Sequence, residues 1–277
     1  MNTDIPSFET VRIELDGPIG ILHMARPDRA NAMNLPMWDE FPKALAWMSA
    51  QPSLRAAILC GDGKHFCAGI DLSILQWLDG VVSDPQACPS RAREKVHAFI
   101  EHAQAALNAC EQLRVPLIAA VHGACVGAGV DMIGACDIRI ATRDARFCIK
   151  EVDMAVVPDV GTLQRLRHVI GYSATAELSL TGETFDGDKA LALGLVSRVC
   201  ADREELLATA RQLAHTIAAK PPTTVRGIKR NLLWARDHDV RDGLAYTAAW
   251  NAGMLMGHDI REAVSAQMEK RAPKYSD

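Results

Sequence analysis

The chain has 277 residues, of which 49% are apolar and 23% are charged, and its formal net charge at pH 7 is −4. These values are typical of a globular protein with one large domain or two small ones. A negatively charged chain has no general attraction for nucleic acids or anionic membrane surfaces, so neither is expected as a partner. No run of about 18 apolar residues occurs, which argues against a membrane-spanning helix.

Eight cysteines are scattered along the chain without a Cys-x-x-Cys pair. This pattern predicts buried thiols in a reducing compartment, and neither the cysteines nor the histidines have the spacing of a metal site. The N-terminus lacks the apolar or Arg-rich run of a targeting segment, and Lys274–Asp277 is not a peroxisomal address. We therefore expect a cytoplasmic protein without a metal.

Short apolar runs predict β-strands, and segments with helical apolar spacing separate them. The expected strands are Val11–Leu15, Ile19–Met24, Arg55–Cys60, Val115–Val121, Ile138–Ala141 and Leu195–Val199. The expected helices in the same part of the chain are Leu35–Ser49, Ala92–Leu113 and Gly127–Ala135, and Asp79–Pro89 is expected to be a loop. The alternation predicts an α/β architecture with a largely parallel, buried sheet that begins with a hairpin.

The pattern becomes almost wholly helical after residue 202. The expected helices are Glu204–Lys220, Thr224–Ala235, Asp239–Met256 and Ile260–Lys270. We therefore divide the chain into a core over residues 1–202 and a helical region over residues 203–277. The helical region has enough apolar surface to pack on another subunit, and packing on its own core explains the pattern equally well.

Two turns of small residues could expose backbone N–H groups. Gly127-Ala128-Gly129 precedes a predicted helix, whose unpaired N–H groups and dipole would favour negative charge, as in an oxyanion hole. Ala68-Gly69 follows a predicted strand and could bring the Ile70 N–H to the same oxygen. Each turn taken alone is better explained by a tight connection that binds no ligand.

Three acids follow the Gly127-Ala128-Gly129 turn, and their neighbours are mostly apolar: Asp131, Glu151 and Asp159. A carboxylate among apolar side chains loses hydration, so its pKa rises toward a value useful for proton transfer. Three such acids beside the turn predict a proton-transfer site. Structural alternatives remain for each: a helix first-turn charge for Asp131, a turn residue for Asp159, and an ion pair with Lys150 or Arg165 for Glu151.

The sequence around both turns resembles the signature of the crotonase (enoyl-CoA hydratase/isomerase) superfamily. The stretch Ile118-Ala-Ala-Val-His-Gly-x-x-x-Gly-Ala-Gly-x-Asp131 carries the signature, and Phe66-Cys-Ala-Gly-Ile-Asp-Leu72 is similar to the family's first oxyanion loop. Further matching segments are Asn31-Ala-Met-Asn34, Gly161-Thr-Leu-Gln-Arg-Leu166, Leu180-Thr-Gly182 and Ala190-x-x-x-Gly194-Leu-Val-Ser197. The resemblance covers most of the chain, from the first predicted strand to the last predicted helix.

This resemblance implies a spiral of ββα units followed by a helical trimerisation region, in a homotrimer or a dimer of trimers. It implies an acyl-coenzyme A thioester as substrate and no cofactor beyond that coenzyme A. The backbone N–H groups of Ile70 and Ala128 would hold the thioester oxygen and stabilise an enolate. The residues implied to bind the substrate are Ala30, Asn31, Ala32, Ala68, Gly69, Ile70, Asp71 and Leu72. Asp71 is also read as a helix cap.

The acids resemble those of the Δ3,5-Δ2,4-dienoyl-CoA isomerase branch. Hydratases of the family activate water with two glutamates at the positions of Asp131 and Glu151, and they usually have glycine at the position of Asp159. In the isomerase branch, Asp159 would take a proton from C2 of the acyl chain and Glu151 would return one at C6, with Asp131 supporting the pair. Two acids on separate loops suit this reaction because C2 and C6 are several ångströms apart.

Two alternatives remain open from the sequence. A 2-enoyl-CoA hydratase could add water with Asp131 and Glu151. A crotonase-fold protein retained for binding, for example of RNA, is opposed by the acidic balance of the chain.

Overall fold

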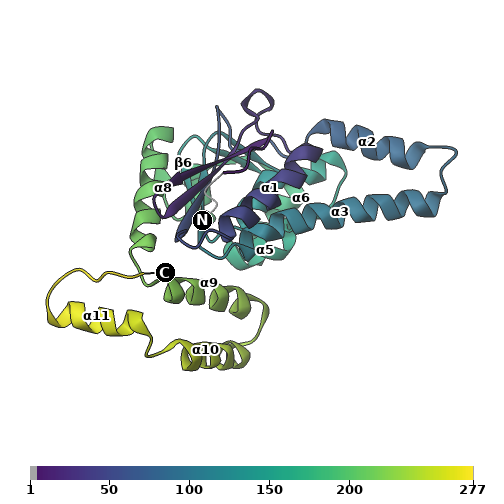
Figure 1. Ribbon diagram of the computed structural model, residues 1–277. Helices are drawn as coiled ribbons and strands as arrows, with labels where there is room; N and C mark the ends of the chain where they lie inside the picture. The colour runs from purple at the N-terminus through teal and green to yellow at the C-terminus, as the bar shows by residue number, and fades with distance from the viewer. Residues whose placement is uncertain (1–4, 277) are drawn as a thin grey trace.

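A six-stranded sheet forms the centre of the structure, a computed structural model that describes residues 5–276 (Figure 1). The strand order is β1-β2-β3-β4-β6-β9. The strands are β1 (Val11–Asp16), β2 (Ile19–Met24), β3 (Ala56–Gly61), β4 (Leu117–Val121), β6 (Ile138–Thr142) and β9 (Val199–Cys200). Strands β1 and β2 form the predicted antiparallel hairpin, and every later neighbour in the order is parallel, which confirms the predicted sheet.

A smaller sheet of three strands lies beside the first: β5 (Ala124–Val126), β7 (Arg146–Cys148) and β8 (Phe185–Asp186). Strand–strand–helix units therefore repeat along the chain, as in β4-β5-α4 and β6-β7-α5, with α4 at Ala128–Gly134 and α5 at Thr162–Val169. Helices α6 (Gly171–Thr181) and α7 (Gly187–Ala192) follow. This succession is the ββα spiral that the resemblance implies.

The central sheet is buried on both faces because successive side chains of a strand point in opposite directions. Leu22 and Leu59 belong to the larger apolar cluster, which also contains Phe41 of α1 (Leu35–Ser49). Ile21 and Ile58 belong to a second cluster, which is closed by three side chains of α8 (Arg203–Ala218): Leu206, Ala210 and Ala214. Both faces being covered explains why the strands read as continuous apolar runs.

Helices α2 (Leu72–Ser83) and α3 (Pro89–Gln112) form an arm that extends from the core (Figure 1). The prediction of a loop over Asp79–Pro89 is therefore wrong at both ends, since only residues 84–88 lie between the two helices. Apolar side chains of α2 reach α3, and the rings of Trp77 and Phe99 meet edge to face at 5.5 Å. Leu78, Val81 and Val82 in the second half of α2 continue the helical apolar spacing of Ile74 and Leu75, so this segment extends the helix.

Four helices occupy the C-terminal part of the chain, as predicted: α8, α9 (Pro222–Asp237), α10 (Val240–Met254) and α11 (His258–Met268). Helix α8 packs on the sheet, whereas α9, α10 and α11 lie beyond the core in Figure 1. The division at residue 203 remains a prediction. The strand expected over Leu195–Val199 is wrong except at Val199, where β9 begins, because Leu195 and Val196 are buried in the larger apolar cluster without forming a strand.

The cysteines of the described residues are free thiols, and seven of the eight are buried, with Cys88 exposed. Within residues 5–276 no helix is long and apolar enough to cross a membrane. Expectations that concern Met1–Asp4 and Asp277 lie outside the described residues.

Candidate active site

A cavity of about 780 Å³ lies between the arm and the two loops that the sequence singled out. Its walls come from α2, α3, the segment before α2, the start of α4, and the segment from Lys150 to Val160. The arm contributes apolar side chains that the sequence did not identify: Leu75, Leu78, Val96, Phe99 and Ile100. Leu75 and Leu78 were missed because α2 was not predicted, whereas Val96, Phe99 and Ile100 lie in a predicted helix and only its packing in the fold turns them toward the cavity.

A short parallel bridge between Cys67 and Cys125 aligns the two loops. The Cys67 N–H donates to the Ala124 carbonyl, and the Val126 N–H donates to the Cys67 carbonyl, both at 2.9 Å. Two glycines meet directly after this bridge. A Cβ on Gly127 would lie 3.9 Å from the Gly69 Cα, and one on Gly69 would lie 3.0 Å from the Val126 carbonyl oxygen.

Both glycines have positive φ angles, 96° at Gly69 and 51° at Gly127, which glycine adopts with little strain. The residues that follow them, Ile70 and Ala128, line the cavity. Neither the Ile70 N–H nor the Ala128 N–H donates a backbone or side-chain hydrogen bond within residues 5–276. Two free donors on adjacent loops can bind one oxygen that becomes negatively charged.

The three predicted acids line this same cavity. Asp131, in the first turn of α4, is fully buried, and its Oδ1 accepts a hydrogen bond of 2.6 Å from the Thr162 N–H. Glu151 begins a 3₁₀ turn, and its Oε1 would lie 3.3 Å from a Cβ on Gly127. Asp159 is exposed, and its carbonyl accepts a hydrogen bond of 2.6 Å from Gln104 of α3.

One oxygen of each inner acid, Asp131 Oδ2 and Glu151 Oε2, is buried and meets no hydrogen-bond donor in the usual geometry among the described residues. Burial raises the pKa of Asp131 to about 7; hydrogen bonding by Thr162 opposes the rise, and the charge of Glu151 adds to it. Burial also raises the pKa of Glu151 and the pKa of Asp159. Asp131 can therefore hold or release a proton near neutral pH, and Glu151 and Asp159 keep their protons to higher pH than ordinary carboxyl groups do.

The ion pairs considered for Glu151 do not form. Lys150 pairs with Asp153 at 2.5 Å, and Arg165 pairs with Glu111 at 2.8 Å. Glu151 is thus left beside the other two acids, facing the cavity. Arg165 belongs to the segment Gly161–Leu166, which resembles the family, yet the sequence did not predict its ion pair with Glu111 of α3.

Six of the eight residues implied to bind the substrate line the cavity: Ala32, Ala68, Gly69, Ile70, Asp71 and Leu72. Ala30 and Asn31 are not in its walls, so their implied direct contact is not supported. The Asn31 amide is fully buried and donates to the carbonyls of Asp62 and His65, at 2.9 and 2.8 Å. These hydrogen bonds fix the loop from its buried side. Ala30 contributes its carbonyl to the Ala68 N–H at 2.9 Å.

Asp71 is a helix cap, as the sequence indicated. Its Oδ1 accepts from the Ser73 N–H at 3.0 Å, and its other oxygen pairs with Arg26 at 3.0 Å. Hydrogen bonds from Ser73 lower the pKa of Asp71, so it is ionised and structural.

Known proteins are similar to this chain in sequence and in fold. It is 45% identical over 270 residues to the peroxisomal Δ(3,5)-Δ(2,4)-dienoyl-CoA isomerase of Arabidopsis thaliana, covering 98% of this chain and 97% of that protein. It is 42% identical over 257 residues to the mitochondrial enzyme of the same name from Rattus norvegicus, covering 92% of this chain and 78% of that protein.

The crystal structure of an enoyl-CoA hydratase from Bacillus anthracis superposes with a TM-score of 0.87 at 28% identity, covering 96% of this chain and 99% of the other. The family model described as enoyl-CoA hydratase/isomerase matches residues 14–277. The chain therefore belongs to the enoyl-CoA hydratase/isomerase family.

Proposed function

We propose that the protein is an isomerase that converts 3,5-dienoyl-CoA to 2,4-dienoyl-CoA. The observation that carries the proposal is the meeting of Asp131, Glu151 and Asp159 with two free backbone donors in one cavity. The two relatives named above as dienoyl-CoA isomerases support it over nearly the whole chain.

The reaction needs two proton transfers at separate carbons. Asp159 takes a proton from C2, and the electron pair moves into a conjugated trienolate whose oxygen accepts hydrogen bonds from the N–H groups of Ile70 and Ala128. Glu151 then donates a proton at C6, which leaves double bonds at C2–C3 and C4–C5. The number of protons on the substrate is unchanged, and Asp131 keeps a proton close to Glu151.

Burial favours this assignment over the hydratase alternative. A hydratase mechanism would use Asp131 and Glu151 to hold a water, but Asp131 is fully buried and one of its oxygens is held by Thr162. Asp159 is the exposed acid of the three, which supports its role as the group that meets an incoming thioester.

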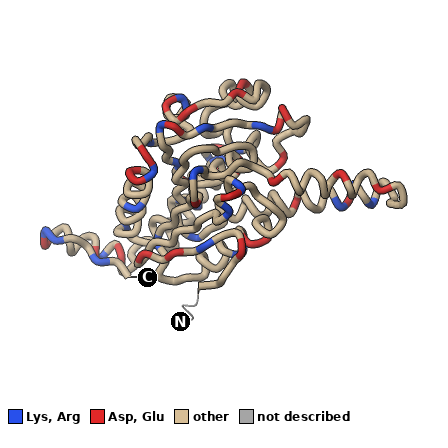
Figure 2. Tube along the Cα trace, turned by 90° about the horizontal axis from the view of Figure 1, so that it is seen from above, with Lys and Arg blue, Asp and Glu red and all other residues tan. Residues whose placement is uncertain are grey.

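The proposal includes the cell compartment, the assembly and the cofactor. Reduced thiols suit a cytoplasmic location, although the relatives named above are peroxisomal and mitochondrial. Exposed apolar side chains on α9 and α10 suit a homotrimer or a dimer of trimers. The coenzyme A of the substrate is the only cofactor required. Along the trace of Figure 2, basic residues are interspersed with acidic ones, which argues against the RNA-binding alternative.

The test is a spectrophotometric assay with purified protein. It offers 3,5-dienoyl-CoA and trans-2-enoyl-CoA separately, and follows the conjugated 2,4-dienoyl absorbance in the first and loss of the enoyl absorbance in the second. Rapid appearance of the 2,4-diene supports the isomerase. Faster water addition to the 2-enoyl substrate would replace it with the hydratase.

A further inference from the structure

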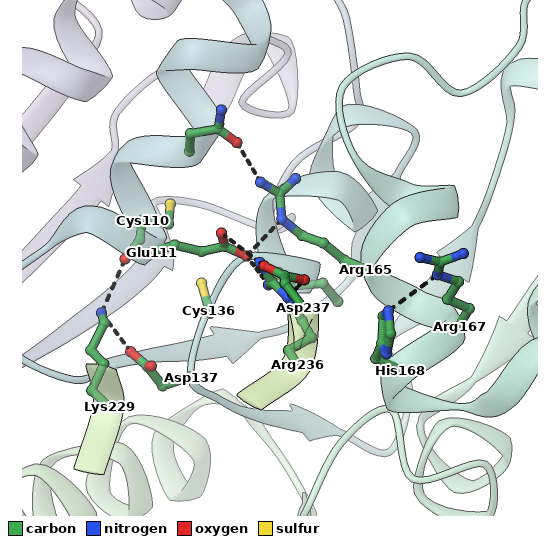
Figure 3. Close-up of polar contacts among 12 residues, drawn as sticks. Cys110, Glu111, Cys136, Asp137, Arg165, Arg167, His168, Lys229, Arg236 and Asp237 are labelled. Carbon is green, nitrogen blue, oxygen red and sulfur yellow. Dashed lines mark hydrogen bonds and ion pairs between the residues drawn. The ribbon is translucent and has the colours of Figure 1, made fainter. Parts of the chain in front are cut away.

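A cluster of largely buried charges joins three segments that are far apart in the sequence (Figure 3). Glu111 lies in the last turn of α3, Arg165 lies in α5, and Arg236 lies in the last turn of α9. Arg165 Nε donates to Glu111 Oε1 at 2.8 Å, and Arg236 Nη1 donates to the same oxygen at 2.5 Å. The Arg165 and Glu111 side chains are 9% and 15% exposed, so solvent screens their pairing weakly.

The guanidinium of Arg165 also holds the loop that carries Asp159. Its Nη1 donates to the Val160 carbonyl at 3.1 Å, and its Nη2 donates to Asn108 of α3. The contact with the loop is close, since a Cβ on Gly161 would lie 1.7 Å from Nη1. The Val160 carbonyl, one residue after Asp159, is thus held by this guanidinium, while the Asp159 carbonyl is held by Gln104.

The same loop reaches the buried acid on its other side, where the Thr162 N–H donates to Asp131. A displacement of Arg165 would therefore be felt at two of the three acids in the cavity. Glu111 is the side chain that orients Arg165, and it is shared with α9.

Glu111 depends on both arginines for its charge. Burial alone would raise the pKa of Glu111, but hydrogen bonds from Arg236 and Arg165 outweigh burial and lower it. Loss of Arg236 would leave a largely buried carboxylate with one cation, which costs free energy and favours a rearrangement of the remaining pair.

We propose that Arg236 and Glu111 are positioning residues that fix Asp159 through Arg165, and so couple helix α9 to the proton-transfer site. Neither residue lines the cavity. The inference rests on the proposed function, because Asp159 must be a reacting group for its position to matter.

The test compares steady-state kinetics of Arg236→Met and Arg236→Lys with wild type on 3,5-dienoyl-CoA. We expect kcat to fall roughly tenfold or more in Arg236→Met, because small displacements of a reacting group are costly, while KM changes less than about twofold. Arg236→Lys should recover part of kcat by restoring the charge. Combined with Glu111→Gln, Arg236→Met should lose little more than the larger single effect, since both act on Arg165.

Two variants serve as matched controls. Lys229, on the same helix, anchors α9 to the carbonyls of Cys110 and Val115 at 3.2 and 3.1 Å without touching the loop. Lys229→Met should lower the melting temperature with kcat nearly unchanged. Asp237→Asn, which removes the exposed partner of Arg236, should leave kcat within about twofold of wild type.

Full kcat in folded Arg236→Met, or a fall of kcat in Lys229→Met as large as in Arg236→Met, would overturn the inference. These outcomes presuppose an active wild type. A wild type without dienoyl-CoA isomerase activity would instead reject the proposed function, and the inference with it.

Discussion

Asp131 has no exposed surface, and its carboxylate shares a small space with Glu151. In the folded chain its carboxylate accepts a hydrogen bond from the Thr162 N–H. This backbone donor replaces the water molecules that would hydrate the carboxylate in the unfolded chain. Burial disfavours the ionised form of Asp131, so an ionised Asp131 lowers the stability of the folded chain.

Replacement of Asp131 by asparagine should therefore stabilise the protein. With a pKa of about 7, against an ordinary value of 3.8, the folded chain holds a proton that the unfolded chain has lost between these pH values. Stability conferred by the protonated form is thus lost as pH rises through this window, a difference on the order of 4 kcal/mol as an upper bound. We expect Asp131→Asn to gain about 1–3 kcal/mol at pH 8 and much less at pH 4.5.

Thermal melting of both proteins at the two pH values measures this effect. A gain of equal size at both pH values would show that ionisation of Asp131 is not its cause.

Removal of the Asp159 carboxylate should abolish most isomerisation. Asp159→Asn keeps the shape of the side chain but cannot take the C2 proton, so kcat should fall roughly a hundredfold or more. Asp153→Asn is the matched control, because Asp153 lies in the neighbouring 3₁₀ turn, pairs with Lys150 and is exposed. An unchanged rate in Asp159→Asn would remove this residue from the mechanism.

The pH dependence of isomerisation should have a limb on each side of its maximum. Asp159 must be ionised, and its raised pKa sets the acidic limb. The Asp131 and Glu151 pair must hold a proton, and loss of that proton above about pH 7 sets the alkaline limb. A rate that rises continuously to pH 9 would contradict the need for a protonated acid.

At the scale of elements, the two oxyanion loops depend on glycine backbone geometry. Gly69→Ala would force a side chain into a φ of 96° with its Cβ 3.0 Å from the Val126 carbonyl oxygen. We expect a loss of about 1 kcal/mol or more in stability and roughly tenfold in kcat, because the Ile70 N–H would move.

Helix α2 offers the control for this substitution. Gly80 lies within the helix, and a Cβ there would meet nothing within 4 Å. Gly80→Ala should stabilise the protein by about 0.5–1 kcal/mol and leave kcat unchanged. Equal kinetic losses in the two variants would mean that the glycine conformation of the loop has no special role.

At the scale of the whole molecule, α9 and α10 present apolar side chains that the chain leaves uncovered. Leu232, Val240 and Leu244 are 68%, 80% and 66% exposed. Apolar surface of this kind is stabilised by burial in a subunit interface. The trimeric or hexameric assembly that we propose would cover it.

Leu244→Glu should therefore shift the assembly toward smaller species, as measured by light scattering after size-exclusion chromatography. Val82→Glu, at an exposed position of α2, should leave the mass unchanged. A monomeric wild-type protein would contradict the assembly proposed.

The sequence by itself determined the elements whose apolar pattern agrees with their burial. Helix α1 matches its predicted bounds, and the hairpin and the parallel strands were predicted because both faces of the sheet are covered. The two small-residue turns and the three acids were also identified in advance, since glycine and carboxylate chemistry is local.

Only the tertiary structure decided which of these groups meet. Asn31 proved to be a buried side chain that holds the loop carbonyls of Asp62 and His65, and Trp77 of α2 proved to pack on Phe99 of α3. The Arg165, Glu111 and Arg236 cluster joins residues separated by 54 and 125 positions in the chain. Sequence spacing carries no record of such pairings, because burial and charge complementarity across three helices arise only when the chain has folded.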